Sequence, residues 1–177
     1  SSGYAVVMFV SRDNNEYNTV NVRHILVKVG TSGEDSSSTD ADWAECKSKI
    51  DEINEEWEAS DKTEEAFGSM ATEKSEDTGS ASNGGLIEDI YKGQMVQEFN
   101  DWCFADGRKV GDYGIVKSTY GYHLIYFSGF GDEYWKTLAD TSKRNADYTA
   151  WYEDYSASYQ GKKNGFGMLF THKALAA

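Results

Sequence analysis

The side chains able to carry reaction chemistry are few in this chain. Its three histidines are His24, His123 and His172, and none lies in an HExxH or CxxH setting, so no metal site is predicted. The sequence has no GxSxG segment and no Walker loop, and the glycine pair at 84–85 lacks the strand and helix that flank a dinucleotide-binding fingerprint. Covalent catalysis and nucleotide chemistry are therefore unsupported.

The two cysteines match no CxxC or zinc spacing. Cys46 and Cys103 each fall on the apolar face of an expected helix, so we predict two buried free thiols. Unpaired cysteines are weak evidence against an oxidising compartment.

The composition describes a folded, acidic chain. Its 177 residues carry a net charge of −13, which argues against nucleic acid as a partner, because that affinity comes largely from Lys and Arg. Aromatic residues make up 14% of the chain, enough apolar surface to offset the entropy of folding. No apolar stretch approaches the ~20 residues of a membrane span, so any membrane attachment would use an anchor outside this chain. The sequence contains no proline.

Periodic apolar residues divide the centre of the chain into strands and helices. We expect a strand at 19–29, helices at 41–58 and 63–73, a turn-rich segment at 75–85, a helix at 95–104 and a hairpin of strands at 115–118 and 122–127. Thr39 or Asp40 is expected to cap the first helix and Thr63 the second. In the strand 19–29, a period of two places His24 and Lys28 on one face with apolar neighbours. The order of elements predicts an α+β fold.

Both ends of the chain carry further expected elements. Tyr4–Val10 is predicted as a strand, and residues 132–160 as a helix with tyrosines on one face. We expect that tyrosine face to pack on the sheet or on a neighbouring domain; the alternative is a docking face for an extended client chain. The tyrosines concerned are Tyr148, Tyr152, Tyr155 and Tyr159.

Five short segments in a fixed order resemble the parvulin-type peptidyl-prolyl cis/trans isomerases. They are RHILVK at 23–28, SEDTGS at 75–80, GG at 84–85, GQMVxxF at 93–99 and YGYHLI at 120–125. The resemblance spans about residues 20–129. It implies a four-stranded antiparallel sheet wrapped by helices, no cofactor, and isomerisation of X-Pro bonds in unfolded or extended polypeptides.

The same resemblance implies roles for individual residues. His24 and His123 correspond to the paired histidines at the centre of the family's site, and Asp77 to a position that is Cys in some members and Asp in many bacterial ones. The implied substrate-binding residues are Ile87, Met95 and Phe99 in an apolar proline pocket, Ser118 near the histidines, Lys28 on the rim, and Tyr120.

Each of these residues also has a purely structural interpretation. The histidines could stabilise the sheet by bonding to one another, and Asp77 lies in a Ser/Gly-rich turn, where Asp is common as a backbone cap. Met95 and Phe99 at i, i+4 would be core residues on any helix, and Lys28 a solvated strand residue. The competing function is accordingly a catalytically inert parvulin-like holding chaperone or protein-interaction module.

Two departures from the family pattern bear on activity. The loop 30–42 carries Glu34, Asp35, Asp40 and Asp42 where phosphate-dependent members carry basic residues, so we expect no phospho-dependence. The glycine-rich segment, usually Gly-Gly-Asp-Leu-Gly, continues here as Leu86-Ile87-Glu88, and Glu88 adopts a positive φ less readily than glycine.

Three segments are expected: an N-terminal strand and linker at 1–18, an isomerase domain at 19–130 and a helical segment at 131–177. The apolar run after Gly3 echoes the one after Gly121, which suggests that Tyr4–Val10 ends a preceding parvulin-like repeat in a longer protein. Analogy with bacterial family members favours a cell-envelope or extracellular foldase, anchored in the full-length protein.

Overall fold

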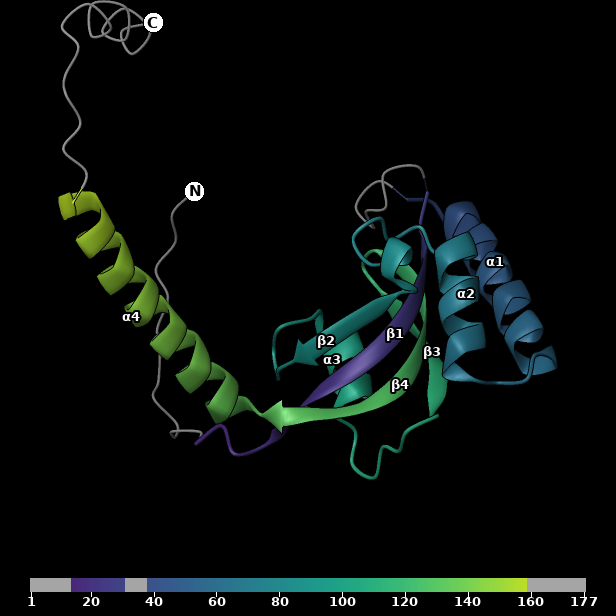
Figure 1. The fold of residues 1–177 in the computed structure, drawn as a ribbon. Helices are drawn as coiled ribbons and strands as arrows, with labels where there is room; N and C mark the ends of the chain where they lie inside the picture. The colour runs from purple at the N-terminus through teal and green to yellow at the C-terminus, as the bar shows by residue number, and fades with distance from the viewer. Residues whose placement is uncertain (1–13, 31–37, 159–177) are drawn as a thin grey trace, which may run out of the picture. The chain divides into compact units, whose positions relative to one another are not determined.

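The computed structural model describes residues 14–30 and 38–158. A four-stranded sheet of order β2-β1-β4-β3 lies at the centre of this part, and all neighbouring strands are antiparallel (Figure 1). The α+β fold with a four-stranded antiparallel sheet and a C-terminal helix is therefore confirmed. In chain order the elements are β1 (Asn18–Lys28), α1 (Asp40–Ala59), α2 (Glu64–Lys74), a 3₁₀ turn (Ala81–Asn83), β2 (Leu86–Ile90), α3 (Gln97–Cys103), β3 (Tyr113–Ser118), β4 (Gly121–Glu133) and α4 (Tyr134–Ser158).

Side-chain caps fix where the first two helices begin. The Thr39 hydroxyl accepts the backbone N–H of Asp42, and the Asp42 carboxylate accepts the backbone N–H of Thr39, which together form a capping box. Thr63 accepts the N–H of Ala66 in the same way. Of the two residues predicted to cap α1, Thr39 is the one that does so.

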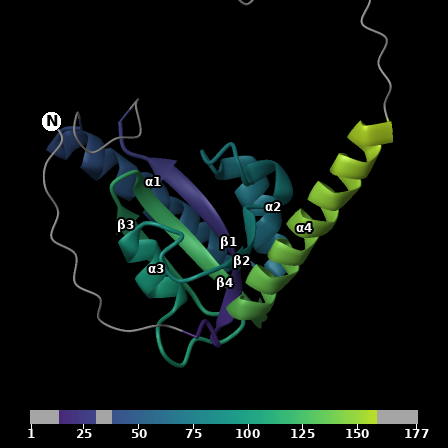
Figure 2. The ribbon, with the colours of Figure 1, turned by 90° about the vertical axis from the view of Figure 1, so that its left-hand side faces the viewer.

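The sheet separates two apolar clusters. Helices α1 and α2 cover one face, where Ile25 and Val27 of β1 pack with Trp57 and Phe67. Helix α3 covers the other face, where Val20 and Val22 pack with Phe99, and Figure 2 shows α3 and α2 on opposite sides of the strands. Because alternate residues of β1 enter different clusters, the predicted period of two is confirmed.

The structure corrects the predicted elements at three places: one missing strand and the bounds of two other elements. Strand β2 was not located by the sequence patterns, since only three central strands were predicted. Helix α3 is shorter than the predicted 95–104, because it begins after Val96, which makes no side-chain cap. Strand β4 continues to Glu133 instead of ending at Phe127, because its last residues pair with the start of β1.

The altered glycine-rich segment forms β2, a strand at the edge of the sheet. Leu86 pairs with Arg23 and Ile87 with Val22, and the register then shifts before Ile90. The non-glycine residue with a positive φ is Asp89, at 54°, and not Glu88. Asp89 is held there by hydrogen bonds to side chains of β1, so the expected strain lies one residue further along than predicted.

The structure divides into two compact units, Ser1–Lys136 and Thr137–Ala177. None of the described residues of α4 is buried. Its aromatic side chains stack on one another, with Trp151 and Tyr155 centroids 5.4 Å apart. Tyr148, Tyr152 and Tyr155 are more than half exposed, and Tyr159 lies outside the described residues. The packing of this face on the sheet or on a neighbouring domain stays a prediction.

Some expectations fall on parts of the chain outside the described residues. These are the strand Tyr4–Val10 with its suggested repeat, most of the acidic loop 30–42, and the tail after residue 158. Within the described residues, no helix combines the length and the apolar character needed to cross a bilayer.

Candidate active site

Strand pairing brings two distant histidines to one face of the sheet. Leu26 of β1 lies directly opposite His123 of β4, and His24 is two residues from Leu26. Residues opposite one another, or two apart on a strand, share a face, so both imidazoles point towards α3. Their Nδ1 atoms are 3.3 Å apart, and both residues are buried.

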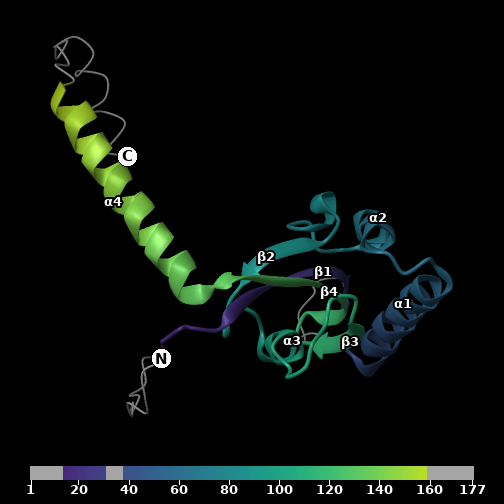
Figure 3. The ribbon, with the colours of Figure 1, turned by 60° about the horizontal axis from the view of Figure 1, so that its bottom comes forward.

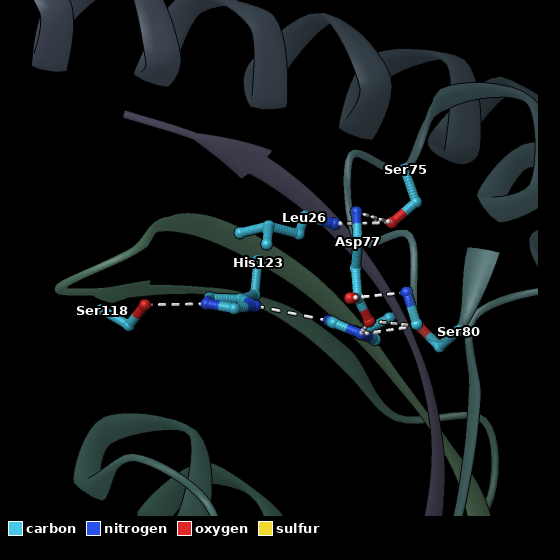
Figure 4. Close-up of polar contacts among 8 residues, drawn as sticks. Leu26, Ser75, Asp77, Ser80, Ser118 and His123 are labelled. Carbon is cyan, nitrogen blue, oxygen red and sulfur yellow. Dashed lines mark hydrogen bonds and ion pairs between the residues drawn. The ribbon is translucent and has the colours of Figure 1, made fainter. Parts of the chain in front are cut away.

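A continuous series of hydrogen bonds runs through the two rings (Figure 4). His24 Nε2 lies 2.9 Å from Asp77 Oδ2 and 3.0 Å from the Ser80 hydroxyl. At the other end, His123 Nε2 lies 2.7 Å from the Ser118 hydroxyl, which also accepts the backbone N–H of Tyr120. We call Asp77, His24, His123 and Ser118 the histidine relay.

The hydrogen-bond partners determine which nitrogen of each histidine carries a proton. The Asp77 carboxylate accepts, so His24 Nε2 carries a proton and His24 Nδ1 accepts. His123 Nδ1–H therefore donates to His24, and His123 Nε2 accepts the Ser118 hydroxyl proton. Every donor and acceptor is satisfied when both histidines are neutral and Asp77 is ionised.

Burial keeps the histidines neutral. It lowers the pKa of His24, although the hydrogen bond and the charge of Asp77 act in the opposite direction. Burial, with a smaller contribution from the charge of His24, lowers the pKa of His123 to about 3. A proton added to His24 Nδ1 would set two donors against each other at 3.3 Å.

Asp77 is the accessible end of the relay. Its side chain is 31% exposed, whereas that of His24 is 6% exposed. Burial raises the pKa of this carboxyl, but hydrogen bonds from Ser80, His24 and the backbone of Gly79 outweigh it, so the pKa is lowered overall. A fixed negative charge therefore lies at the accessible end of the relay near neutral pH.

Backbone bonds to β1 hold the segment that carries Asp77. The N–H of Glu76 donates to the carbonyl of Leu26 at 2.8 Å, and the N–H of Leu26 donates to the Ser75 hydroxyl at 3.1 Å. Further along, the N–H of His24 donates to the carbonyl of Gly85 at 2.9 Å. The segment 75–85 is thus tied to the same strand that supplies His24.

Arg23 adds a clamp from the other face of β1. Its Nε donates to Glu64 of α2 at 2.9 Å, and its Nη1 donates to the carbonyls of Asn83 and Gly84 at 3.2 and 2.9 Å. One guanidinium therefore joins β1, α2 and the turn that follows Asp77. Sequence reasoning did not single out Arg23.

Ser80 was also missed. It is 6% exposed, bonds both Asp77 and His24, and donates to the carboxylate at 2.5 Å. Its position three residues after Asp77 in a serine-rich turn was the available signal, because a side chain at that spacing can fold back onto the carboxylate.

The apolar residues of the predicted pocket lie beside the relay. Phe99 of α3 contacts both imidazoles edge-on, with centroids 5.6 Å from His24 and 5.4 Å from His123. Because Phe99 is only 2% exposed, it forms the base of the site and cannot grip a substrate ring by itself. Ile87 and Met95 are half-buried in the same cluster and present accessible apolar surface.

Of the remaining predicted residues, Ser118 lies within the site, whereas Tyr120 and Lys28 are exposed. Ser118 is part of the relay, and Tyr120, 50% exposed, follows it in the turn between β3 and β4. Lys28 is exposed at the end of β1, where its backbone N–H donates to Glu76. The structure thus gathers His24, Asp77, His123, Ser118 and Phe99 in direct contact.

The described residues hold no cluster of three or more His, Cys, Asp or Glu side chains suited to a metal ion. Cys46 and Cys103 are buried and unpaired, as predicted. Burial raises the pKa of Cys46, and it raises the pKa of Cys103 to about 12, so neither thiol is an activated nucleophile.

A compact antiparallel sheet with a buried histidine relay and an apolar base defines the parvulin class of domain. The family model of the PPIC-type PPIase domain matches residues 4–129, and this chain belongs to that family.

Individual relatives carry foldase names. The chain is 45% identical over 64 residues to the foldase protein PrsA 1 of Listeria innocua, which covers 36% of this chain and 22% of that protein. It is 38% identical over 104 residues to the foldase protein PrsA of Staphylococcus aureus, which covers 58% of this chain and 30% of that protein. This chain therefore spans less than a third of the length of these relatives. A crystal structure of the peptidylprolyl isomerase PrsA from Bacillus cereus aligns with a TM-score of 0.49 and 27% identity, over 68% of this chain and 38% of the other.

Proposed function

We propose that this chain catalyses the cis/trans isomerisation of X-Pro bonds in extended or unfolded polypeptides, without a cofactor or a covalent intermediate. The observation that carries the proposal is the histidine relay, which ends in an accessible ionised carboxylate beside apolar surface. We assign this activity to residues 19–130, with 1–18 as an N-terminal strand and linker and 131–177 as a separate helical segment.

The reaction requires the enzyme to favour a twisted amide. Resonance holds the peptide bond planar behind a barrier of ~18–20 kcal/mol, and it does so by placing negative charge on the carbonyl oxygen. Catalysis therefore needs groups that disfavour this charge separation and bind the twisted form more tightly than either planar form. A nucleophile is not needed.

Asp77 supplies the charge in this proposal. A carboxylate beside the substrate carbonyl disfavours negative charge on its oxygen and so weakens the partial double bond. Ser80 and His24 hold that carboxylate in place, and His123 and Ser118 hold His24 in the tautomer that donates to it. Asp77 and the two histidines are the proposed catalytic residues.

The apolar surface positions the proline ring. Ile87 and Met95 are the accessible contacts, and Phe99 supports the histidines from below. Lys28, Ser118 and Tyr120 complete the proposed substrate-binding set. Excluding water from this region strengthens the effect of the carboxylate.

The proposed clients are proline-containing unfolded or nascent polypeptides, with no requirement for phosphate before proline. The acidic residues of the loop 30–42 support the second point, because phosphate would be repelled there. Similarity to the PrsA foldases supports a bacterial cell-envelope or extracellular location, with any anchor outside this chain.

Exchange NMR on short Ala-Pro peptides tests the activity directly. Asp77→Asn keeps the shape of the side chain but removes its charge, and we expect it to lower kcat/KM by about tenfold or more. Thr78→Ala, an exposed change in the same turn, is the matched control and should leave the rate unchanged. A wild-type rate no faster than buffer would overturn the proposal.

The exposed aromatic face of α4 favours a second candidate, an inert holding chaperone. Tyr148, Trp151, Tyr152 and Tyr155 all expose more than half of their surface, and such faces bind unfolded segments. An aggregation assay with the Tyr152→Ser, Tyr155→Ser double variant tests it, and this candidate fails if the wild-type chain never protects a client.

A further inference from the structure

A recess lies on the sheet face that carries the histidines. It has a volume of about 330 Å³, near the lower end of the range for ligand clefts, ~300–1,000 Å³. The start of β1, the segment after β2, the turn after α3 and the end of β4 form its walls. Figure 3 shows α3 below β4. The lining residues that matter are Tyr17, Lys92, Phe104, Asp106, Arg108 and Phe130.

The recess exposes aromatic surface that the fold does not bury. Phe130 is 58% exposed, although one side of its ring packs on the buried Phe127 at 5.0 Å between centroids. Phe104 is half-buried and meets Tyr17 edge-on at 6.0 Å. An aromatic side chain entering the recess would therefore find ring faces and edges to contact.

The recess also carries positive charge, in a chain whose net charge is −13. The Lys92 ammonium lies 4.7 Å from the Tyr17 ring centroid and 5.9 Å from that of Phe104, and it makes no ion pair within the described residues. Arg108 donates two hydrogen bonds to the carbonyl of Trp102. Lys92 is therefore the group placed to pair with a ligand carboxylate, and Asp106 is the local opposing charge.

The recess and the relay share one face of one strand. Asn18, which lines the recess, and His24 both face α3, because the residues between them alternate through Val20 and Val22. His24 follows Asn18 by six residues, which corresponds to about 20 Å along a strand. Because α3 covers Val20 and Val22 between the two places, an extended polypeptide must pass around the helix and needs at least this number of residues to reach both.

We propose that this recess is a second binding site for an extended polypeptide client, and that it takes a phenylalanine followed by an acidic residue. This inference rests on the proposed function, because it places the client's Phe-Asp pair at least about six residues from the proline held at the relay. The aromatic contacts select the ring, and Lys92 selects the carboxylate.

Two measurements on the same chain test the proposal separately from the isomerase activity. The first is NMR titration with a proline-free peptide that carries Phe-Asp within a Gly/Ser sequence, beside matched Phe-Lys and Leu-Asp peptides. We expect shifts at the backbone amides of Asn18, Lys92 and Phe130, and binding about tenfold weaker for the Phe-Lys peptide. The second is kcat/KM for Ala-Pro peptides with and without a Phe-Asp pair placed six or more residues from the proline, on either side.

Surface variants assign the effect to the recess. Phe130→Ser and Lys92→Gln should each weaken Phe-Asp binding about tenfold, whereas Asp106→Asn should strengthen it. Val110→Ser is the matched control, since Val110 is 64% exposed near β4 but does not line the recess. None of these residues belongs to the relay.

The outcomes separate the two ideas. Shifts at the recess without isomerisation of any peptide would overturn the isomerase and leave a polypeptide site. If kcat/KM is the same with and without the distant Phe-Asp pair, and no NMR shifts occur at the recess, the second site alone would be overturned. Equal binding of Phe-Asp and Phe-Lys would overturn the role of Lys92.

Discussion

Lowering the pH should destabilise this domain through its buried histidines before its carboxylates titrate. In the unfolded chain His123 takes up a proton near pH 6.5, whereas in the folded chain burial delays uptake to about pH 3. The unfolded state therefore binds more protons throughout this window. Stability is fully present above pH 6.5 and falls as the pH falls towards 3.

The size of the loss follows from the two pKa values. Between pH 7 and pH 4.5, protonation of His123 favours the unfolded state by about 2.5 kcal/mol. The pKa of His24 is lowered too, so its contribution has the same sign. The pKa of Asp77 is also lowered, but from 3.8, so its contribution to stability is lost only at lower pH. Against a typical total of ~5–15 kcal/mol, the histidine loss is large.

Urea unfolding followed by tryptophan fluorescence at pH 7.0, 6.0, 5.0 and 4.5 measures this loss. His123→Gln removes the titrating group. The slope of its free energy of unfolding against pH should therefore be smaller by an amount equivalent to up to one proton, whatever its stability at pH 7. Nitrogen NMR of the imidazoles should find the proton on Nε2 of His24 and on Nδ1 of His123. A histidine pair that titrates near 6.5 in the folded protein, or a pH slope that His123→Gln leaves unchanged, would refute this reasoning.

Three other predictions concern a hydrogen-bonded arginine, a closely packed glycine and the rate of refolding. Arg23→Gln removes the hydrogen bonds to the turn at 83–84, so it should lower the free energy of unfolding by about 1–3 kcal/mol and reduce isomerase activity. Glu64→Gln removes only a partly exposed ion pair and should lower the free energy of unfolding by under ~1 kcal/mol. Urea unfolding and exchange NMR measure the two effects. Gly85 has a φ of +69°, and Gly85→Ala places a Cβ 2.3 Å from the carbonyl oxygen of His24. We therefore expect calorimetry to show a lower melting temperature, and an unchanged melting temperature would contradict the observed packing. Refolding should lack the prolyl phase of tens of seconds, because the chain has no proline, and a slow phase accelerated by another prolyl isomerase would be inconsistent with that.

The elements with strong local signals were predictable from sequence. Helices α1 and α2 begin at threonines whose side chains cap the backbone, and α1 carries an apolar stripe that needs no distant partner to be recognised. Strand β1 alternates cleanly enough that both of its faces were assigned correctly.

The elements that depend on distant partners were missed or cut short. Strand β2 has five residues, two of them acidic, and exists because β1 offers a pairing edge with a shifted register. The end of β4, from Ser128 to Glu133, is rich in glycine and acidic residues, and pairing with the start of β1 keeps it extended.

The site shows the same division. The sequence alone determined which residue types were available and, through alternation, that His24 faces the same way as Leu26. Only the tertiary structure decided that His123, 99 residues later, would lie against His24, because the β1–β4 register sets that distance. The neutral state of the pair, the ionised state of Asp77 and the roles of Arg23 and Ser80 follow from burial and hydrogen bonding in the folded chain, and these are properties of packing that a linear sequence does not contain.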